Sequence, residues 1–438
     1  MSPTLAVSPA VIGILGLLLF FLFLTVEMPI AMAMLITGFG GIALISGPRA
    51  ALTTLSGESF EIATYLELSV IPLFVFMGNL AGLSGMSRDL YKAAHAWTGH
   101  RRGGLAATTI IGCAGFAALS GSSFASAVTM GRVALPEMKR YRYADSLATG
   151  CVAAGGTLGF LIPPSSGFVI YAILTEQSIG QLFIAGILPG LLLTGLFLLA
   201  IALLTRLHPE IAPAADSVDW SERWRSTRRA GTFIGIVTLT IGGIYAGVIT
   251  PVEAAGVGAF LTLLVALVRR TLTRGALEAV ILHTLRTTAL TFMILIGAHV
   301  FIPFMALSQI PDTLARLLTG LPLGHTGILL VILGVYIFLG TFLEGIAMLV
   351  LTLPVFFPVI LAMGYSPIWF GVLVVIVLEM GLISPPVGVN VFVVKGVAPG
   401  VSVGTIFRGI WPFWLAMLVC IVILVCFPQI ALFLPGKM

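Results

Sequence analysis

Two double prolines lie within long apolar segments, each four residues after a glycine. Residues 159–166 read GFLIPPSS and residues 381–388 read GLISPPVG, so the two motifs are offset by 222 positions. A double proline removes two backbone donors and cannot continue an α-helix, and in lipid it leaves carbonyls that protein, water or an ion must satisfy. Free carbonyls can bind a cation, whereas the free amides of a helix N-terminus can bind an anion. The motifs therefore predict two broken membrane helices at a transport site.

Polar residues near both breaks have the chemistry of a sodium site. Hydroxyl, amide and carbonyl oxygens are hard ligands, which suit Na⁺ better than a transition metal. We predict Na⁺ ligands at Ser123, Ser165, Ser384 and Asn390. The full set of predicted ion-binding or substrate-binding residues is Ser120, Gly121, Ser122, Ser123, Gly159, Pro163, Ser165 and Ser166 in the first half, and Glu344, Gly345, Glu379, Gly381, Ser384, Pro385, Gly388 and Asn390 in the second. The alternative is that these residues only kink helices and permit close packing.

Ionisable residues within the apolar segments need a separate explanation, because a charge in lipid costs about 2.5–3.5 kcal/mol on insertion scales. Glu379 lies two residues before Gly381 and fits a binding site and a structural anchor equally well. Glu344 lies at a predicted turn, which favours a place near the site. His299 has no acidic residue close to it in the sequence, which favours helix packing over a proton relay.

Composition places the chain in the membrane. Its 438 residues are 59% hydrophobic and 9% charged, with a mean hydropathy of +1.14. Many apolar runs of about 20 residues predict an all-α polytopic membrane protein. The net charge of +5 comes from basic loops, so membrane topology explains it better than nucleic-acid binding. The sequence contains no Walker-type loop, His-Glu-x-x-His motif or paired intramembrane aspartates, and neither an enzyme activity nor an organic cofactor is expected.

The basic loops predict a re-entrant hairpin. Lysine and arginine cluster between Arg88 and Arg102 and again between Lys139 and Arg142, and the positive-inside rule assigns both clusters to the cytoplasm. The uncharged stretch 103–131 between them must then enter and leave the membrane on one side, with its tip at Ser120–Ser123. One continuous helix that violates the charge rule is the alternative.

The offset of 222 predicts a second hairpin before Pro358, with its tip at Leu343–Gly345 and with flanks that lack lysine and arginine. The two repeats then have opposite orientations, as in inverted-repeat transporters. The predicted layout comprises N-terminal scaffold helices at 1–65; a first repeat at 66–205 with a hairpin at about 103–136 and a broken helix at about 146–175; a cytoplasmic linker and central scaffold helices at 206–286, ending in a short surface helix at about 273–287; and a second repeat at 287–438 with a hairpin at about 324–358 and a broken helix at about 367–395.

Three segments resemble the large membrane subunit of the tripartite ATP-independent periplasmic (TRAP) transporters, the DctM family. They are GTLGFLIPPS at 156–165, SGSSFASA at 120–127 and GLISPPVGVN at 381–390, and the resemblance covers nearly the whole chain. Ser384 stands where the family often has threonine, which keeps a hydroxyl at that position. The resemblance implies Na⁺-coupled uptake of an organic acid, such as a C4-dicarboxylate or sialic acid, by an elevator in the bacterial inner membrane. It also implies two partners, a small four-helix membrane subunit of the DctQ family and a periplasmic solute-binding protein.

Two other functions remain open at the level of sequence. A self-sufficient Na⁺/carboxylate symporter of the same layout would transport without any partner. A structural or assembly subunit would show no Na⁺-dependent flux in any combination.

Overall fold

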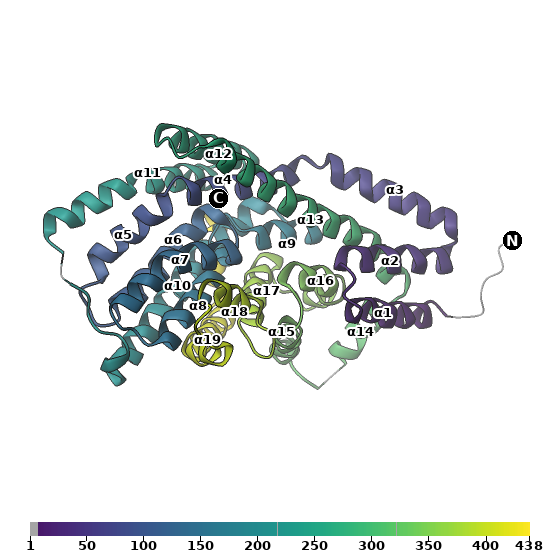
Figure 1. Ribbon diagram of the computed structural model, residues 1–438. Helices are drawn as coiled ribbons and strands as arrows, with labels where there is room; N and C mark the ends of the chain where they lie inside the picture. Colours follow the sequence, from purple (N-terminus) through teal and green to yellow (C-terminus); the bar gives the residue numbers. More distant parts are fainter. Residues whose placement is uncertain (1–7, 217, 321) are drawn as a thin grey trace. The chain divides into compact units, whose positions relative to one another are not determined.

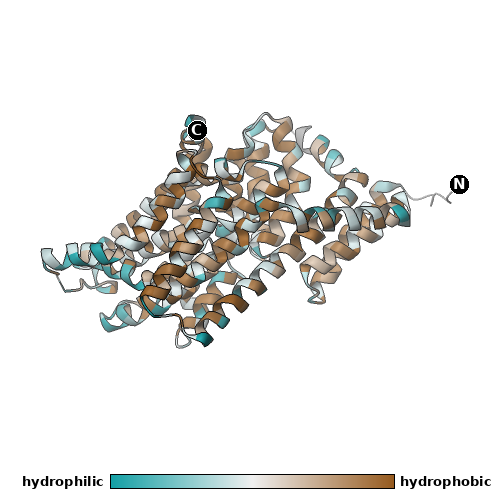
Figure 2. Ribbon diagram, turned by 90° about the horizontal axis from the view of Figure 1, so that it is seen from above, coloured by the Kyte–Doolittle hydropathy of each residue, from teal (hydrophilic) through white to brown (hydrophobic). Residues whose placement is uncertain are grey.

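The computed structural model describes residues 8–216, 218–320 and 322–438, whose regular secondary structure is helical, with no strand among them (Figure 1). Most helices are hydrophobic along their length, and hydrophilic residues gather toward helix ends and connections (Figure 2). In the part of the chain described, seven helices are long and apolar enough to cross a membrane by length and composition. The prediction of an all-α polytopic membrane protein is therefore confirmed.

The α-helices are α1 (Pro9–Thr25), α2 (Ile30–Ser46), α3 (Pro48–Thr64), α4 (Val70–Leu83), α5 (Met86–Thr98), α6 (Gly104–Ser120), α7 (Ser123–Arg140), α8 (Asp145–Leu161), α9 (Ser166–Thr175), α10 (Ile179–Leu207), α11 (Trp220–Tyr245), α12 (Pro251–Val268), α13 (Arg274–Leu307), α14 (Ile310–Thr319), α15 (His325–Gly340), α16 (Gly345–Ala362), α17 (Pro367–Leu382), α18 (Val389–Val397), α19 (Val403–Cys426) and α20 (Gln429–Leu432). Short 3₁₀ helices lie at Leu66–Ser69, Pro209–Ile211 and Pro435–Lys437.

Helix bounds repeat at the same offset as the proline motifs. Helices α7 and α16 both begin and end 222 positions apart, α8 and α17 begin 222 apart, and α9 and α18 end 222 apart. Helices α2 and α12 also end 222 positions apart. One element differs from the expected layout. The predicted short helix at 273–287 is only the start of α13, because no glycine or proline interrupts the apolar run from Leu285 to Gly297.

The described residues divide into two compact units. Unit 1 combines the chain before Val70 with Leu285–Val335 and Ile346–Pro367. Within it α2 packs closely on α13, since a Cβ at Gly38 would lie 2.8 Å from the carbonyl oxygen of Val300. The same unit contains an ion pair that sequence reasoning missed, between Glu58 Oε2 and His299 Nδ1 at 3.3 Å. His299 thus has an acidic partner from α3, 241 positions away in the sequence.

Unit 2 combines Val70–Thr284, Tyr336–Gly345 and Ile368–Met438. Its α8 packs against α6, α7 and α19 (Figure 1). All residues of α8 from Leu147 to Leu161 are buried, as expected for a helix that is hydrophobic on every side. Small residues allow the close approach, and a Cβ on Gly150 would overlap the carbonyl of Gly409 in α19. Every predicted binding residue belongs to unit 2.

Candidate functional site

The first predicted tip is a tight turn between α6 and α7. Helix α6 ends at Ser120, and Gly121 follows in the left-handed region at φ +57°, a conformation that favours glycine. Ser122 caps the next helix, with its Oγ accepting a hydrogen bond from the Ala125 amide at 3.4 Å. The hydroxyls of Ser120 and Ser126 are hydrogen-bonded at 3.0 Å and close the turn from both sides.

The first break separates α8 from α9 at the double proline, and the Pro163–Pro164 peptide bond is cis. Ser165 satisfies two backbone groups that the break leaves free. Its hydroxyl donates to the carbonyl of Phe160 and accepts from the amide of Phe168 at 3.2 Å. Ser165 is 1% exposed and Pro163 is buried. The Ser165 side chain therefore acts first as a helix cap, which leaves one lone pair for an ion.

The tip and the break are joined directly. Ser166 donates to the carbonyl of Gly121 from its amide at 3.2 Å and from its hydroxyl at 2.7 Å. Gly159 in α8 lies against the tip backbone, because a Cβ there would be 2.6 Å from the carbonyl oxygen of Ser122. Only glycine permits this approach without a shift of backbone. The structure thus brings Gly121, Ser122, Gly159 and Ser166 together.

The second tip and break repeat this arrangement. Residues 341–344 connect α15 to α16, so Glu344 lies half-buried in the turn and Gly345 begins the helix. Gly381, which is 222 positions after Gly159, also approaches its hairpin closely, since a Cβ there would lie 2.6 Å from the Cα of Gly340. The Pro385–Pro386 bond is cis, and Gly388 at φ +59° precedes α18. Unlike Pro163, Pro385 is exposed.

Ser384 is already hydrogen-bonded on both sides. Its hydroxyl donates to the Met380 carbonyl at 2.6 Å and accepts from Trp414 Nε1 in α19 at 2.8 Å. Sequence reasoning missed Trp414, because no motif links a tryptophan in a later apolar helix to a hydroxyl 30 residues earlier. Like Ser165, Ser384 retains one lone pair for a ligand.

Glu379 connects the two halves of the site. Ser123, the first residue of α7, donates from its hydroxyl to Glu379 Oε1 in α17 at 2.5 Å. Glu379 is 1% exposed, and its second oxygen, Oε2, has no hydrogen-bond partner among the residues described. One carboxylate oxygen therefore anchors the first tip, and the other is buried and unsatisfied.

Asn390 is the second buried group without partners. It lies in the first turn of α18 and is 0% exposed, and within the described chain neither Oδ1 nor Nδ2 forms a hydrogen bond. Buried polar groups are nearly always satisfied, and an unsatisfied one costs about 1–3 kcal/mol. Glu379 and Asn390 thus provide oxygen atoms suited to a cation. No hydrogen bond connects Asn390 to the residues of the first break among those described.

The chain is similar to known proteins over most of its length. Residues 17–430 match the family model described as tripartite ATP-independent periplasmic transporter, DctM component. The C4-dicarboxylate TRAP transporter large permease protein DctM of Pseudomonas aeruginosa is 36% identical over 398 residues, which cover 91% of this chain and 92% of that protein. The sialic acid TRAP transporter large permease protein SiaM of Vibrio cholerae is 32% identical over 394 residues, 88% of this chain and 91% of the relative.

The chain is also similar to a third large permease and to one solved transporter structure. The ectoine/5-hydroxyectoine TRAP transporter large permease protein UehC of Ruegeria pomeroyi is 31% identical and covers 93% of this chain and 94% of its own. The solved structure of the YdaH transporter of Alcanivorax borkumensis aligns with a TM-score of 0.63 over 87% of this chain and 88% of that one. At 19% identity the YdaH likeness shows the fold alone. The family model and the large-permease relatives, in contrast, span nearly the whole chain, and together they show that it belongs to the tripartite ATP-independent periplasmic transporter family as the DctM component, the large permease.

Proposed function

We propose that this large permease imports an organic acid with Na⁺ as the coupling ion. The observation that carries the proposal is the pair of buried, unsatisfied groups, Glu379 Oε2 and Asn390, in the two halves of the second broken helix. Discontinuous helices offer free carbonyls to a cation and free amides to an anion, which is what co-transport of Na⁺ with a carboxylate requires. Ser123, Ser165 and Ser384 supply further hydroxyl oxygens.

The substrate class follows from charge and from the relatives. Two relatives are named for C4-dicarboxylate and sialic acid, which share a carboxylate. The amide N-terminus of α18 is suited to such an anion, and Gly388 keeps it free of side-chain bulk. In α9 the Ser166 and Phe168 amides already donate to Gly121 and Ser165. We propose that a periplasmic binding protein delivers the acid, and that a small membrane subunit of the DctQ family completes the permease in the bacterial inner membrane.

Reconstitution separates this function from that of a self-sufficient symporter. The purified chain alone in proteoliposomes should not accumulate the acid, whereas the chain with its small subunit and loaded binding protein should. Transport by the chain alone would favour the symporter. Absence of Na⁺-dependent flux in every combination would favour a structural or assembly role.

We also propose that the repeats are inverted and that both tips and both breaks move as an elevator. Single cysteines at Lys92 and Lys139 should react with an impermeant maleimide from the cytoplasm, and those at His325 and Ser366 from the periplasm, in a background with the four native cysteines replaced by serine. Labelling of Lys92 and Lys139 from opposite sides would contradict the re-entrant first hairpin. If Na⁺ and substrate leave the labelling of a cysteine at Phe342, next to the second tip, unchanged, the elevator is wrong.

A further inference from the structure

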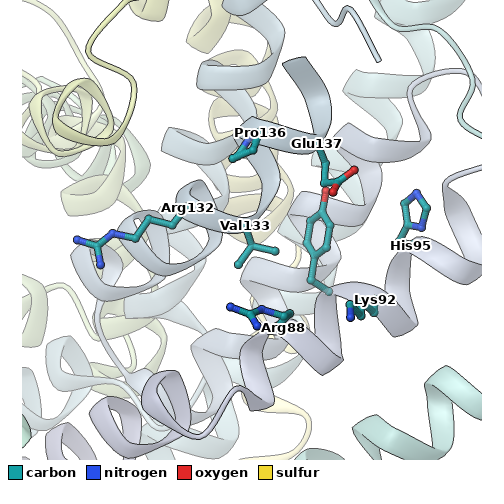
Figure 3. Close-up of a pocket in the computed structure, with 8 residues that line it drawn as sticks. Arg88, Lys92, His95, Arg132, Val133, Pro136 and Glu137 are labelled. Carbon is teal, nitrogen blue, oxygen red and sulfur yellow. The ribbon is translucent and has the colours of Figure 1, made fainter. Parts of the chain in front are cut away.

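A cavity of about 380 Å³ lies between α5 and α7 in unit 2, outside the transport site (Figure 3). Basic side chains dominate its lining, and only one carboxylate faces them. The lining residues are Arg88, Tyr91, Lys92 and His95 from α5, and Arg132, Val133, Pro136 and Glu137 from α7. Neither the proline motifs nor the tips contribute to it.

The cavity carries excess positive charge. Helix α5 places Arg88, Lys92 and His95 on one face, at positions i, i+4 and i+7 (Figure 3). Among the described residues, none of Arg88, Lys92 and Arg132 forms an ion pair, so only Glu137 offsets these three permanent charges. Asp89, the acidic residue of α5, is paired with Arg269 at 2.6 Å. A concave surface with unpaired charges of one sign attracts a counter-ion.

The positive-inside rule explains why these residues are basic. It does not explain why they line one cavity. At the offset of 222, Arg88, Lys92, His95, Arg132 and Glu137 map to apolar residues in the second repeat, namely Ile310, Leu314, Leu317, Pro354 and Val359, and Tyr91 maps to Thr313. Helices α14 and α16 form at these positions without such charges. The basic lining is therefore not needed to build an amphipathic helix followed by a hairpin.

Two lining residues are placed to complete an anion site. Tyr91 is 3% exposed, and within the described chain its hydroxyl has no hydrogen-bond partner. Burial lowers the pKa of His95 below its ordinary value, against the opposing influence of Glu137 and Asp216. Arginine guanidinium groups match phosphate oxygens in geometry, and a tyrosine hydroxyl can donate to the same group.

The position of α5 favours a lipid as the source of the anion. The helix connects the apolar helices α4 and α6, and it buries Met86, Tyr91 and Ala94 while Arg88 and Lys92 remain exposed. An amphipathic helix between two apolar ones is suited to lie along the membrane surface. Trp97 at its end packs edge-on against Trp220 and Trp224, at centroid distances of 5.5 and 6.0 Å, as is typical of an interfacial aromatic cluster.

We propose that this basic cavity binds the phosphate group of an acidic phospholipid headgroup at the surface where α5 lies. Arg88, Lys92 and Arg132 supply the charge, and the Tyr91 hydroxyl supplies a buried donor. Because the lining comes from both α5 and α7, a bound headgroup would hold the first hairpin against the surface helix.

The test compares lipid binding in two variants of equal charge. Purified full-length protein in detergent is titrated with phosphatidylglycerol or phosphatidylcholine, with binding followed by native mass spectrometry and by the lipid-induced rise in Tm. Lys92→Gln/Arg132→Gln should weaken phosphatidylglycerol binding about 10- to 30-fold, since two charges next to the headgroup are lost. Arg101→Gln/Lys139→Gln removes two charges from the same basic loops outside the cavity and should bind as the wild type does.

A charge-preserving variant and a competing anion identify the ligand. Lys92→Arg/Arg132→Lys keeps both charges and should restore binding, which excludes misfolding as the cause of the loss. Inorganic phosphate should compete with phosphatidylglycerol only weakly. Equal losses in the two glutamine variants, or equal binding of phosphatidylglycerol and phosphatidylcholine, would overturn the proposal. Tight binding of inorganic phosphate with no preference for the acidic lipid would show that a soluble anion is the ligand, and would overturn the lipid assignment.

Discussion

Gly159→Ala is expected to lower the maximal rate of uptake by roughly 5- to 150-fold at unchanged expression. The added Cβ would lie 2.6 Å from the Ser122 carbonyl oxygen and 2.9 Å from the Ser123 amide nitrogen, so the backbone of the first tip must move. Overpacking of this kind costs about 1–3 kcal/mol, and each 1.36 kcal/mol is about a factor of ten in rate if the strain acts on the transport cycle. Uptake by the reconstituted complex, normalised to the amount of permease, measures the effect.

Gly195→Ala is the matched control for this experiment. Gly195 lies in α10 of the same unit, and a Cβ there meets no atom within 4 Å, so the variant should transport normally. If Gly159→Ala transports at the wild-type rate, the contact between the first tip and α8 does not influence the steps that limit transport.

Asn390→Ala and Glu379→Gln are expected to raise the Na⁺ concentration for half-maximal uptake by about tenfold or more. Each removes or neutralises a buried group that has an unsatisfied oxygen, and a hydrogen-bond or ligand contact to a charged species contributes about 1.5–3 kcal/mol. The amide in Glu379→Gln still accepts from Ser123, so this variant isolates the effect of charge from that of the anchor. Initial rates measured across a series of Na⁺ concentrations give the half-saturation value.

Two substitutions at other places in the chain remove the same kinds of group, an asparagine amide and a glutamate charge, and serve as controls. Asn79 is hydrogen-bonded to Thr284 Oγ1 at 3.1 Å, and Glu253 completes the N-terminal capping box of α12. Asn79→Ala and Glu253→Gln should leave the Na⁺ dependence unchanged.

Ser165→Ala and Ser384→Ala should shift the Na⁺ dependence less than Asn390→Ala does, because both hydroxyls are occupied by backbone or indole partners. Unchanged Na⁺ dependence in Asn390→Ala and Glu379→Gln would show that Na⁺ does not bind at this site.

The proline motifs predicted where two pairs of helices are broken because prolines act locally. A double proline ends a helix wherever it stands, so the C-terminal ends of α8 and α17 and the starts of α9 and α18 follow from the sequence. The turn at Gly121 needs a left-handed residue, and the glycine marks it. Tip positions near Ser122 and Glu344 could be identified for the same reason.

Contacts between distant segments could not be predicted in this way. Nothing in the sequence near Glu379 indicates that Ser123, 256 positions earlier, donates to it, and the same holds for Trp414 with Ser384 and Glu58 with His299. These pairs depend on which helix faces pack together, a property that apolar periodicity leaves open when a helix is hydrophobic on all sides. The convergence of basic residues on the cavity between α5 and α7 was hidden for the same reason, because the topology rule already explained each charge singly.

Uptake driven by an imposed Na⁺ gradient is the most direct test of the central claim. Proteoliposomes that contain this chain and its small subunit are supplied with binding protein loaded with a labelled organic acid, and an inward gradient of NaCl or of KCl is then applied at equal ionic strength. The account predicts accumulation with Na⁺, none with K⁺, and loss of accumulation when the binding protein is omitted. Equal accumulation with Na⁺ and K⁺, or uptake that does not require the binding protein, would contradict it.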